Sequence, residues 1–303
     1  MSLAEGADGC GDGACGCAQA PRTPVLSCAD ALRAAGARVE TVTAQSDADI
    51  DEIIARLDGP AREDGLTWPG GDAKTRLVVA AAADGQLRAV VRRLVRRYAP
   101  PPSRRPTDLA ADRTLPDLPP IGVLPLAPAR DLVARLGLPR KPAAVAAAVL
   151  GDRIRRLDLL RTDAGSVTLD GALIGAAGED GKPMTWRGRV EVDGATLTAG
   201  DDPLLACAVG NADGYAWLDG LPLLRTADAA DGRVEVAVAV PVVARSLLRG
   251  KRVRVEVRRA RGRAVAVTPQ ETEVPFLDDG VGGTLTRKRS WWIEPGAWAV
   301  YES

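Results

Sequence analysis

The sequence contains no histidine, so the commonest metal ligand and the usual general base of enzymes are both missing. A Ser-His-Asp hydrolase and a zinc enzyme with histidine ligands are therefore excluded. No stretch approaches about 18 uninterrupted apolar residues, and no membrane span is expected. The N-terminal residues lack the basic start and the apolar run of a signal peptide, which predicts a cytoplasmic protein.

An excess of either charge is also missing, because 40 basic residues balance 40 acidic ones. No overall electrostatic field attracts nucleic acid or an anionic membrane, so no nucleic-acid partner is expected and any membrane contact is expected to be peripheral. The 303 residues suffice for one large hydrophobic core or two smaller ones. The sequence does not indicate an oligomeric state.

Cysteine is scarce, and three of the 5 cysteines lie in a segment rich in glycine and alanine. Residues 1–24 are predicted to form a disordered tail, because this composition supplies little apolar surface to bury. Cys10, Cys15 and Cys17 offer four thiolates together with Cys28, but they lack the paired C-x2-C spacing of zinc sites. Two interpretations of these cysteines remain, a zinc site and a reduced tail without a metal. The reduced tail is the preferred interpretation, and no residue is assigned as a metal ligand.

The chain is organised around residues 76–98, in which an apolar run ends at Asp84 and Gly85 and a helical pattern follows. In the helical part, apolar residues recur at helical spacing and arginines fill the other face. A buried strand, a tight turn and an amphipathic helix form a βα unit of a parallel sheet. Ligands of such sheets bind at the carboxyl end of the strand, which makes Asp84 and Gly85 candidates for a binding site.

Further helices and strands complete an α/β domain over residues 25–145. Ser46 or Asp47 is expected to cap a helix whose isoleucines form an apolar stripe. Residues 99–120 hold seven of the 22 prolines and are predicted to be a mobile surface insertion without regular structure. The other elements expected in this half are helices at 28–37, 132–136 and 142–150 and strands at 39–43 and 121–126.

Residues 146–287 show a different pattern, in which short strands are separated by Asp-Gly and Gly turns. This spacing is typical of an antiparallel β-sandwich, the expected second domain. A last strand over 291–300 is assigned to the first domain, which then comprises residues 25–145 plus 288–303. The strands expected in the sandwich lie at 156–159, 166–169, 172–175, 188–192, 195–198, 204–209, 233–241, 252–257 and 263–267.

The turn at 82–86 resembles the nucleotide-binding turn of the diacylglycerol kinase and bacterial lipid kinase family. That family has Gly-Gly-Asp-Gly-Thr after a valine-rich strand, and this chain has Ala-Ala-Asp-Gly-Gln at the same place. The resemblance implies a nucleotide site that includes Ala83, Asp84, Gly85 and Gln86, with the aspartate orienting the nucleotide and Mg²⁺. The preferred alternative needs no ligand and makes Asp84 the N-cap of the helix that follows.

A second segment resembles the same family at the expected distance. Where the family has Gly-Thr-Gly-Asn-Asp, residues 127–131 of this chain are Ala-Pro-Ala-Arg-Asp. The following Ala-Arg-Leu-Gly-Leu-Pro at 134–139 closely resembles the family pattern. The resemblance therefore implies that Ala127, Pro128 and Asp131 also belong to the nucleotide site.

A third motif bears on catalysis. The family carries Asp-Gly-Glu near its C-terminus, and its glutamate takes the proton of the acceptor hydroxyl. Here the corresponding turn is Asp278-Asp279-Gly280-Val281, and valine cannot accept a proton. Asp278 and Asp279 are the remaining candidates for a catalytic base, and the alternative is that they are hairpin-turn residues.

The lost glycines decide the functional expectation. Backbone N–H groups must approach phosphate oxygens closely, and each alanine in place of glycine adds a methyl group there, while Pro128 removes a donor. We expect a diverged lipid-kinase homologue with eroded phosphate-binding loops, weakly active or non-catalytic, that acts in regulation or ligand binding. The alternatives are an active kinase that uses ATP and Mg²⁺ to phosphorylate a lipid hydroxyl, and a small-molecule binder that uses a cleft between the domains. A lipid or another small molecule is the expected partner.

Overall fold

The computed structural model describes residues 2–3, 22–70, 75–127, 132–175, 184–212, 215–218, 220–225, 227–246, 250–271 and 273–303. The chain folds into two compact units, Met1–Leu157 with Ala297–Ser303 and Asp158–Gly296. They are called the first and the second unit below, and each is described by itself. The cysteines at 10, 15 and 17, with the question of a zinc site, lie outside the described residues.

The first unit contains a parallel sheet with the strand order β2-β1-β3-β4-β18. β3 and β4 pair over their length, and their residues are mostly buried, as in parallel sheets whose faces are covered by helices. The last residues of β18 pair with the start of β4 through Ala299 and Val300, and only Ala297–Ser303 of the predicted 288–303 fall in the first unit. The strands are β1 (Ser2–Leu3), β2 (Thr43–Ala44), β3 (Leu77–Ala81), β4 (Pro120–Pro125) and β18 (Arg289–Tyr301).

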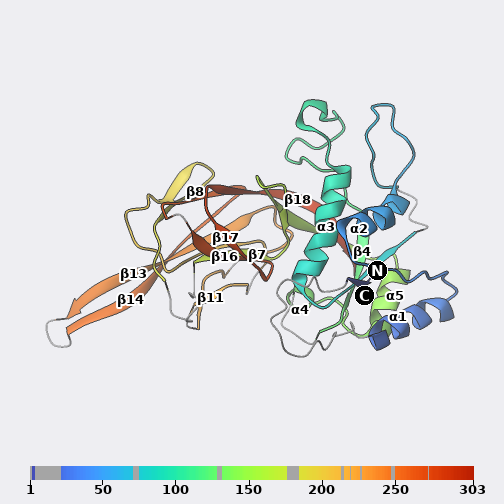
Figure 1. Ribbon diagram of the computed structural model, residues 1–303, viewed down its shortest axis with the longest axis horizontal. Helices are drawn as coiled ribbons and strands as arrows, with labels where there is room; N and C mark the ends of the chain where they lie inside the picture. Colours follow the sequence, from blue (N-terminus) through green and yellow to red (C-terminus); the bar gives the residue numbers. More distant parts are fainter. Residues whose placement is uncertain are drawn as a thin grey trace, which may run out of the picture. The chain divides into compact units, whose positions relative to one another are not determined.

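Helices cover this sheet in two pairs (Figure 1). α1 (Arg22–Ala34) and α5 (Pro142–Leu150) share a hydrophobic core with β3, β4 and Tyr301. α2 (Asp47–Ile54) packs on α3 (Asp84–Tyr98) on the other side of the sheet in that view. The apolar face predicted for α3 is buried in full: Leu87, Val90, Val91, Leu94, Val95 and Tyr98.

Several boundaries differ from the sequence prediction. α1 begins at Arg22 rather than at residue 28, and Ser2–Leu3 form β1, so residues 2–3 and 22–24 are not part of a disordered tail. The strand predicted at 39–43 is reduced to Thr43–Ala44. Ser46, not Asp47, caps α2: its side chain and that of Asp49 exchange hydrogen bonds with each other's backbone N–H groups.

The arginines of α3 are more than a solvated surface. Arg93, whose side chain is only 11% exposed, pairs with two aspartates of α2, and Arg97 pairs with Asp58 beyond the end of α2. Arg92 also binds Asp47. These ion pairs connect α2 to α3 across the edge of their apolar contact, although each exposed pair adds at most about 1 kcal/mol.

Residues 99–120 contain little regular structure, as predicted, apart from one 3-10 turn at Pro102–Arg104. The prediction of a surface insertion is wrong for the second half of this segment, because Leu115 and Leu118 are fully buried. The N–H group of Leu118 also donates to the carbonyl of Ala297 at 2.9 Å. Two leucines in the proline-rich stretch therefore attach it to the core of the first unit.

Gly122 of β4 gives a first testable prediction. A Cβ atom at this position would overlap Cγ2 of Val149 on α5, and valine has few rotamers with which to withdraw. Gly122→Ala should therefore lower the free energy of unfolding by about 1–3 kcal/mol in urea denaturation. The control is Gly282→Ala, whose Cβ would have only Cδ2 of Leu277 nearby, at 3.9 Å. Equal stabilities of the two variants would contradict this account of the β4–α5 contact.

The second unit is an antiparallel β-sandwich, as predicted. One sheet has the order β18-β15-β8-β9 with β5 and β6 beside β18, and the other has the order β14-β13-β10-β7-β16-β17. Val190, Val267 and Trp291 of the first sheet share one buried cluster with Ile174, Val209 and Val236 of the second. Side chains of both sheets thus fill a common core, which defines a sandwich.

The strands of this unit follow the predicted turns, with four additions, β11, β12, β16 and β17. β16 and β17 form a hairpin that the alternation pattern does not reveal, because Pro275 and two glycines interrupt it. The strands are β5 (Ile154–Thr162), β6 (Val167–Thr168), β7 (Gly171–Gly175), β8 (Gly188–Val192), β9 (Ala195–Thr198), β10 (Ala206–Gly210), β11 (Trp217–Leu218), β12 (Leu221–Pro222), β13 (Val234–Ser246), β14 (Gly250–Gly262), β15 (Ala264–Pro269), β16 (Val274–Asp278) and β17 (Val281–Leu285).

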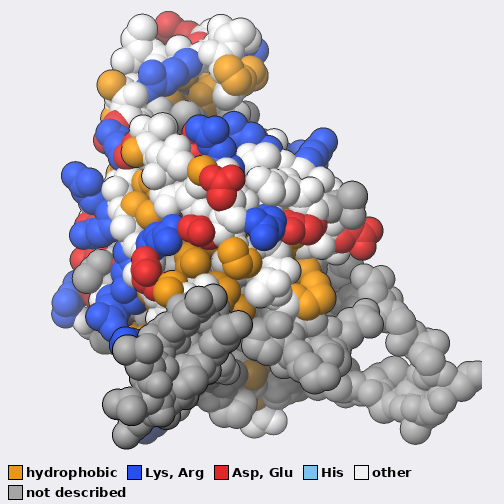
Figure 2. All heavy atoms as spheres, turned by 90° about the vertical axis from the view of Figure 1, so that its left-hand side faces the viewer, with side chains coloured by type: hydrophobic (Ala, Val, Ile, Leu, Met, Phe, Trp, Pro, Cys, Tyr) orange, Lys and Arg blue, Asp and Glu red, His pale blue; other side chains and the backbone are white. Residues whose placement is uncertain are grey.

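Two properties of the surface complete the description. Lys and Arg side chains are interspersed with Asp and Glu on the face drawn in Figure 2, and apolar side chains reach the surface among them. Within the described part of the chain, none of the helices combines the length and the apolar character that a membrane crossing requires.

Candidate functional site

The candidate site of the first unit lies where β3 and β4 end. Ala81 pairs with Pro125 at the last rung of these parallel strands, and the N–H group of Leu126 donates to the carbonyl of Ala81 at 2.8 Å. The turn at 82–86 and the segment that begins at Ala127 therefore leave the same edge of the sheet. The structure brings the two family-like motifs together, as expected for adjacent parallel strands.

Asp84 is the central side chain of this edge, and it binds a neighbouring helix. Both of its carboxylate oxygens accept the N–H group of Leu132 at 3.1 Å, and Oδ2 lies 3.2 Å from Nη2 of Arg135. Leu132 is the first residue of α4 (Leu132–Arg135), so Asp84 satisfies an N–H group that the short helix leaves open. The carboxylate is 19% exposed.

Asp84 does not cap its own helix, and that part of the sequence interpretation is wrong. The N-cap of α3 is Ala83, where no side chain accepts a hydrogen bond, and Asp84 is the first helical residue. The reason is geometric, because strand β4 brings α4 within reach of Asp84. A carboxylate is stabilised at the positive N-terminal end of α4 as well as at the start of α3. Sequence distance hides this contact, because Leu132 follows Asp84 by 48 positions.

Gln86 uses its side chain within the same turn. Its Oε1 accepts the N–H group of Ala82 at 2.7 Å, so the third helical residue reaches back to the residue before the N-cap. Ala83 has φ −146° and ψ 155°, an extended conformation that any residue adopts. The alanine at 83 therefore carries no positive-φ strain. Gly85 lies half-buried in the first turn of α3.

The second motif is described only in part. The carbonyl of Ala127 accepts Nη2 of Arg140 at 3.2 Å. Pro128 and Asp131, with residues 129 and 130 between them, lie outside the described residues. Gly137 has φ 65° directly after α4, which agrees with the predicted end of that helix.

The candidate catalytic residues of the second unit are buried. Asp278 ends β16 and is 4% exposed, and Asp279 follows it in the turn to β17 and is 2% exposed. The carboxylate of Asp279 accepts the N–H groups of Leu169 at 2.8 Å, Asp170 at 2.9 Å and Gly171 at 3.2 Å. It therefore fixes the β16–β17 turn to the bend between β6 and β7.

The electrostatic surroundings of Asp279 are acidic. Burial, and next the nearby Asp278, raise the pKa of Asp279 well above its ordinary value of 3.8, although backbone N–H groups oppose the shift. Thr168 donates its hydroxyl to Asp278 at 2.7 Å. Burial also raises the pKa of Tyr215, and Asp279 adds to this shift.

A third buried group of this region, Asn211, directly follows β10. Its Nδ2 donates to the carbonyls of Asp158 at 2.8 Å and Leu169 at 3.0 Å. Sequence reasoning missed Leu132, Arg135 and Thr168 as partners of the candidate site. The strand order, which places their segments beside the motifs, is the signal that identifies them.

Comparison with known proteins agrees with these motifs. The family model described as "Diacylglycerol kinase catalytic domain" matches residues 15–162, which include both turns at the edge of the parallel sheet. Residues 15–162 of this chain are thus similar in sequence to a diacylglycerol kinase catalytic domain. No curated protein sequence matches the chain.

Solved structures share the fold of this chain. A crystal structure of a diacylglycerol kinase from Bacillus anthracis str. Sterne is 16% identical, with a TM-score of 0.62 over 93% of this chain and 91% of that one. Two structures of provisionally assigned diacylglycerol kinases from the same organism are 13% and 15% identical, each with a TM-score of 0.63 over 93% of this chain. These two matches cover 90% and 92% of the respective chains.

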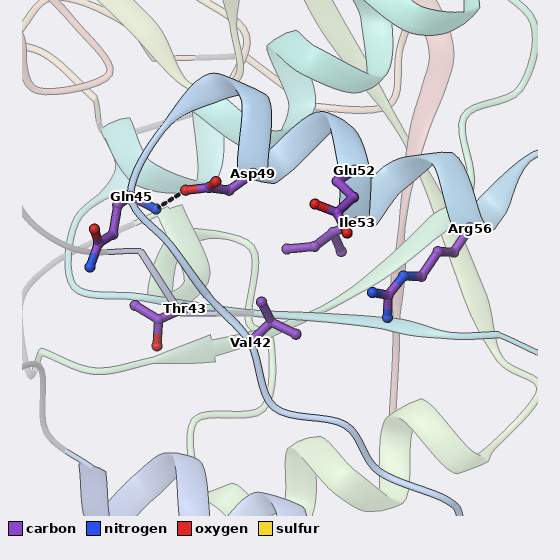
Figure 3. Close-up of a pocket in the computed structure, with 7 residues that line it drawn as sticks. All are labelled: Val42, Thr43, Gln45, Asp49, Glu52, Ile53 and Arg56. Carbon is purple, nitrogen blue, oxygen red and sulfur yellow. Dashed lines mark hydrogen bonds between the residues drawn. The ribbon is translucent and has the colours of Figure 1, made fainter.

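Two pockets lie beside α2, and neither is lined by the turn at 82–86. The smaller has a volume of about 290 Å³ and is lined by Glu52 of α2, by Arg56 in the 3-10 turn Ala55–Leu57 that follows it, and by Val42 and Thr43 (Figure 3). Asp49, also at its wall, accepts the N–H group of Gln45 at 2.7 Å and so belongs to the start of α2. The larger, of about 590 Å³, lies against α1 and β3 and has mainly aliphatic walls.

Proposed function

We propose that this chain is a diverged member of the diacylglycerol kinase family that has lost phosphoryl transfer and acts as a regulatory or ligand-binding protein. The observation that carries the proposal is the state of the turn after β3. The carboxylate of Asp84 is engaged by Leu132 and Arg135, and the N–H group of Ala82 is engaged by Gln86. Groups that a nucleotide and its metal ion need are therefore used to hold the turn itself.

A triphosphate with Mg²⁺ does not fit these residues. Phosphate oxygens require open backbone N–H groups, and Mg²⁺ requires carboxylate oxygens in octahedral geometry. Among the described residues, no group of three or more cysteines, aspartates and glutamates is arranged to hold a metal ion. No catalytic step through ATP or Mg²⁺ is therefore derived for this chain.

The second unit supports the same proposal. Val281, which replaces the glutamate base of the family motif, is 42% exposed and has no group that accepts a proton. Asp278 and Asp279, the remaining candidates, are buried and bind Thr168 and three backbone N–H groups. A general base must reach the hydroxyl that it deprotonates, and carboxylates used in this way are poorly placed to do so. A lipid or other small molecule as ligand, and the cytoplasmic location, are parts of this proposal.

Titration with Mg-ATP and with ADP tests the proposal by thermal unfolding. If a nucleotide bound, a concentration of a hundred times its Kd would add about 2.7 kcal/mol to the free energy of unfolding and raise the unfolding temperature. Because we propose that no nucleotide binds, the expected result is no saturable shift of this temperature. ADP formation from Mg-ATP with mixed lipid vesicles should also stay at background, while an active diacylglycerol kinase serves as the positive control. A saturable shift, or ADP formation that depends on lipid, would establish the alternative of a working lipid kinase.

A further inference from the structure

The larger pocket of the first unit lies where the parallel sheet is interrupted. β1 separates β2 from β3, but it is only two residues long and pairs with Thr43 and Ala44 on one side and with Ala80 on the other. Residues 37–42 lead into β2, residues 75–78 lead into and begin β3, and both segments line the pocket. No described strand lies between these two segments. The resulting volume of about 590 Å³ falls within the roughly 300–1,000 Å³ of small-molecule sites.

The walls of this pocket are mainly aliphatic. α1 contributes the buried side chains of Cys28 and Leu32, and α5 contributes Val149. Ile53 of α2 and Leu57 of the following 3-10 turn also line the pocket. None of the described lining residues is aromatic. A ligand that covers these walls removes apolar surface from water, and the walls favour an aliphatic chain over a ring that would need a stacking partner.

The charged residues of the pocket carry an excess of positive charge. They are three arginines and one glutamate, Arg38, Arg56, Arg76 and Glu40. Arg56 is neutralised by Glu40, whose Oε2 lies 2.8 Å from its Nη1. Arg76 donates to the carbonyl of Gly151 at 2.7 Å and is thereby fixed at the end of α5. Arg38 is exposed, and no hydrogen bond or ion pair within the described part of the chain engages its side chain.

We propose that this pocket binds an aliphatic monocarboxylate, with its chain on the walls from α1 and α5 and its carboxylate at Arg38. The planar guanidinium matches a carboxylate through two parallel N–H groups. One available arginine compensates a single negative charge, which favours a carboxylate over a doubly charged phosphate monoester. The inference rests on the ligand-binding part of the proposed function, to which it gives a site. It does not depend on the loss of nucleotide binding at the turn 82–86.

A simpler interpretation makes the pocket a packing defect. The alanines and valines around the interrupted sheet would then leave a water-filled hollow without a ligand. That interpretation predicts that no aliphatic molecule binds and that Arg38 has no role. The proposal predicts binding that requires both the chain and the negative charge.

Isothermal titration calorimetry of the full chain with decanoate, below its critical micelle concentration, tests the proposal. The expected result is saturable binding of one molecule per chain. Removal of CH₂ groups should weaken binding roughly fourfold for each group, so octanoate should bind less tightly than decanoate. Acetate has the charge without the chain, and decyltrimethylammonium has the chain with the opposite charge. Neither should bind.

Two variants locate the ligand. Arg38→Gln should bind decanoate about tenfold more weakly, because a tenfold change is about 1.4 kcal/mol, close to the lower end for hydrogen bonds to charged groups. The matched control is Arg96→Gln, at an exposed arginine of α3 outside the pocket. Ala29→Leu places a larger side chain in the pocket and should abolish binding while the fold is kept. Ala34→Leu, at an exposed position of α1, is its control. Both controls should bind like the wild type.

Several results would overturn the proposal. They are the absence of saturable decanoate binding, equal binding of decyltrimethylammonium, and equal affinities of Arg38→Gln and Arg96→Gln. Wild-type binding by Ala29→Leu would place the ligand elsewhere, and a marked loss of stability in this variant would show that the hollow is absent. Decanoate binding together with lipid-dependent ADP formation would refute only the loss of phosphoryl transfer. A chain that binds neither decanoate nor nucleotide would refute only this inference.

Discussion

Replacement of Asp279 by alanine should lower the free energy of unfolding of the second unit by about 3–5 kcal/mol. Three backbone N–H groups, at Leu169, Asp170 and Gly171, would lose their acceptor in a buried site, and each unsatisfied donor costs about 1–3 kcal/mol. Asp279 also has φ 48°, a conformation that costs alanine about 1 kcal/mol more than it costs asparagine or aspartate. Urea denaturation followed by tryptophan fluorescence measures the loss.

Asp279→Asn separates the charge from the hydrogen bonds. Asparagine tolerates the same backbone conformation and keeps one acceptor oxygen, so it should cost less than alanine. Because the folded-state pKa of Asp279 is raised, the folded state holds its proton at a pH where the unfolded chain has released it. The stability that this carboxyl contributes is therefore complete below the ordinary value of 3.8 and is lost as pH rises through the folded-state pKa.

The pH series gives the sharper result. The difference in unfolding free energy between wild type and Asp279→Asn should shift in favour of the variant as pH rises from 4 towards neutrality. Asp201→Ala, a change at an exposed carboxylate of the same unit, is the control and should leave the wild-type profile intact. The contrary result would be that the unfolding free energies of wild type and Asp279→Asn change in parallel with pH. Asp279 would then be ionised in the folded state at every pH tested.

Replacement of Asp84 by alanine should cost about 2–3 kcal/mol of stability in the first unit. The change removes the acceptor for the N–H group of Leu132 and the ion pair with Arg135, and hydrogen bonds to charged groups contribute about 1.5–3 kcal/mol each. This exceeds the loss of about 1 kcal/mol for a simple N-cap. Asp84→Asn should keep the bond to Leu132 and lose the ion pair, so its stability should lie in between.

Asp152→Ala is the matched control for Asp84. The carboxylate of Asp152 also pairs with an arginine, Arg76 at 3.3 Å, but is 99% exposed, so its loss should cost less than about 1 kcal/mol. Hydrogen exchange of the α4 amides should rise in Asp84→Ala and not in Asp152→Ala. An Asp84→Ala protein with wild-type stability that has lost a saturable Mg-ATP shift would make Asp84 a nucleotide ligand and refute the proposed function.

The fold of the first unit follows from local patterns to a large extent. The helical spacing of α3, the Gly137 stop and the apolar runs of β3 and β4 each reflect a strong local preference. The sequence prediction begins α1 too late, because the first turn of this helix has no capping residue or acidic group. Only the burial of α1 against α5 supports this turn. The sequence does not predict the burial of Leu115, because prolines surround this residue. Prolines exclude regular secondary structure, but they do not determine whether a neighbouring side chain packs in the core.

The candidate site was predicted less well than the fold, for a physical reason. Sequence patterns identified Asp84 and Asp279 as polar residues at strand ends, and both lie there. The partners of these carboxylates come from segments far away in sequence, and such contacts depend on strand order and register. A cap and a tertiary hydrogen bond need the same residue type, so the local sequence alone does not separate them.

The pairing of β18 with β4 has a consequence for biogenesis. During synthesis, residues 297–301 leave the ribosome only after the entire second unit, yet they supply the strand that lies beside β4 in the first. The parallel sheet therefore stays one strand short, with the edge of β4 exposed, until residues 297–301 have been synthesised. The sandwich, which needs no later segment apart from its own part of β18, is expected to mature without this delay. A nascent chain stalled before Ala297 should accordingly protect the sandwich from protease while β4 and its neighbours remain open to cleavage or to chaperones.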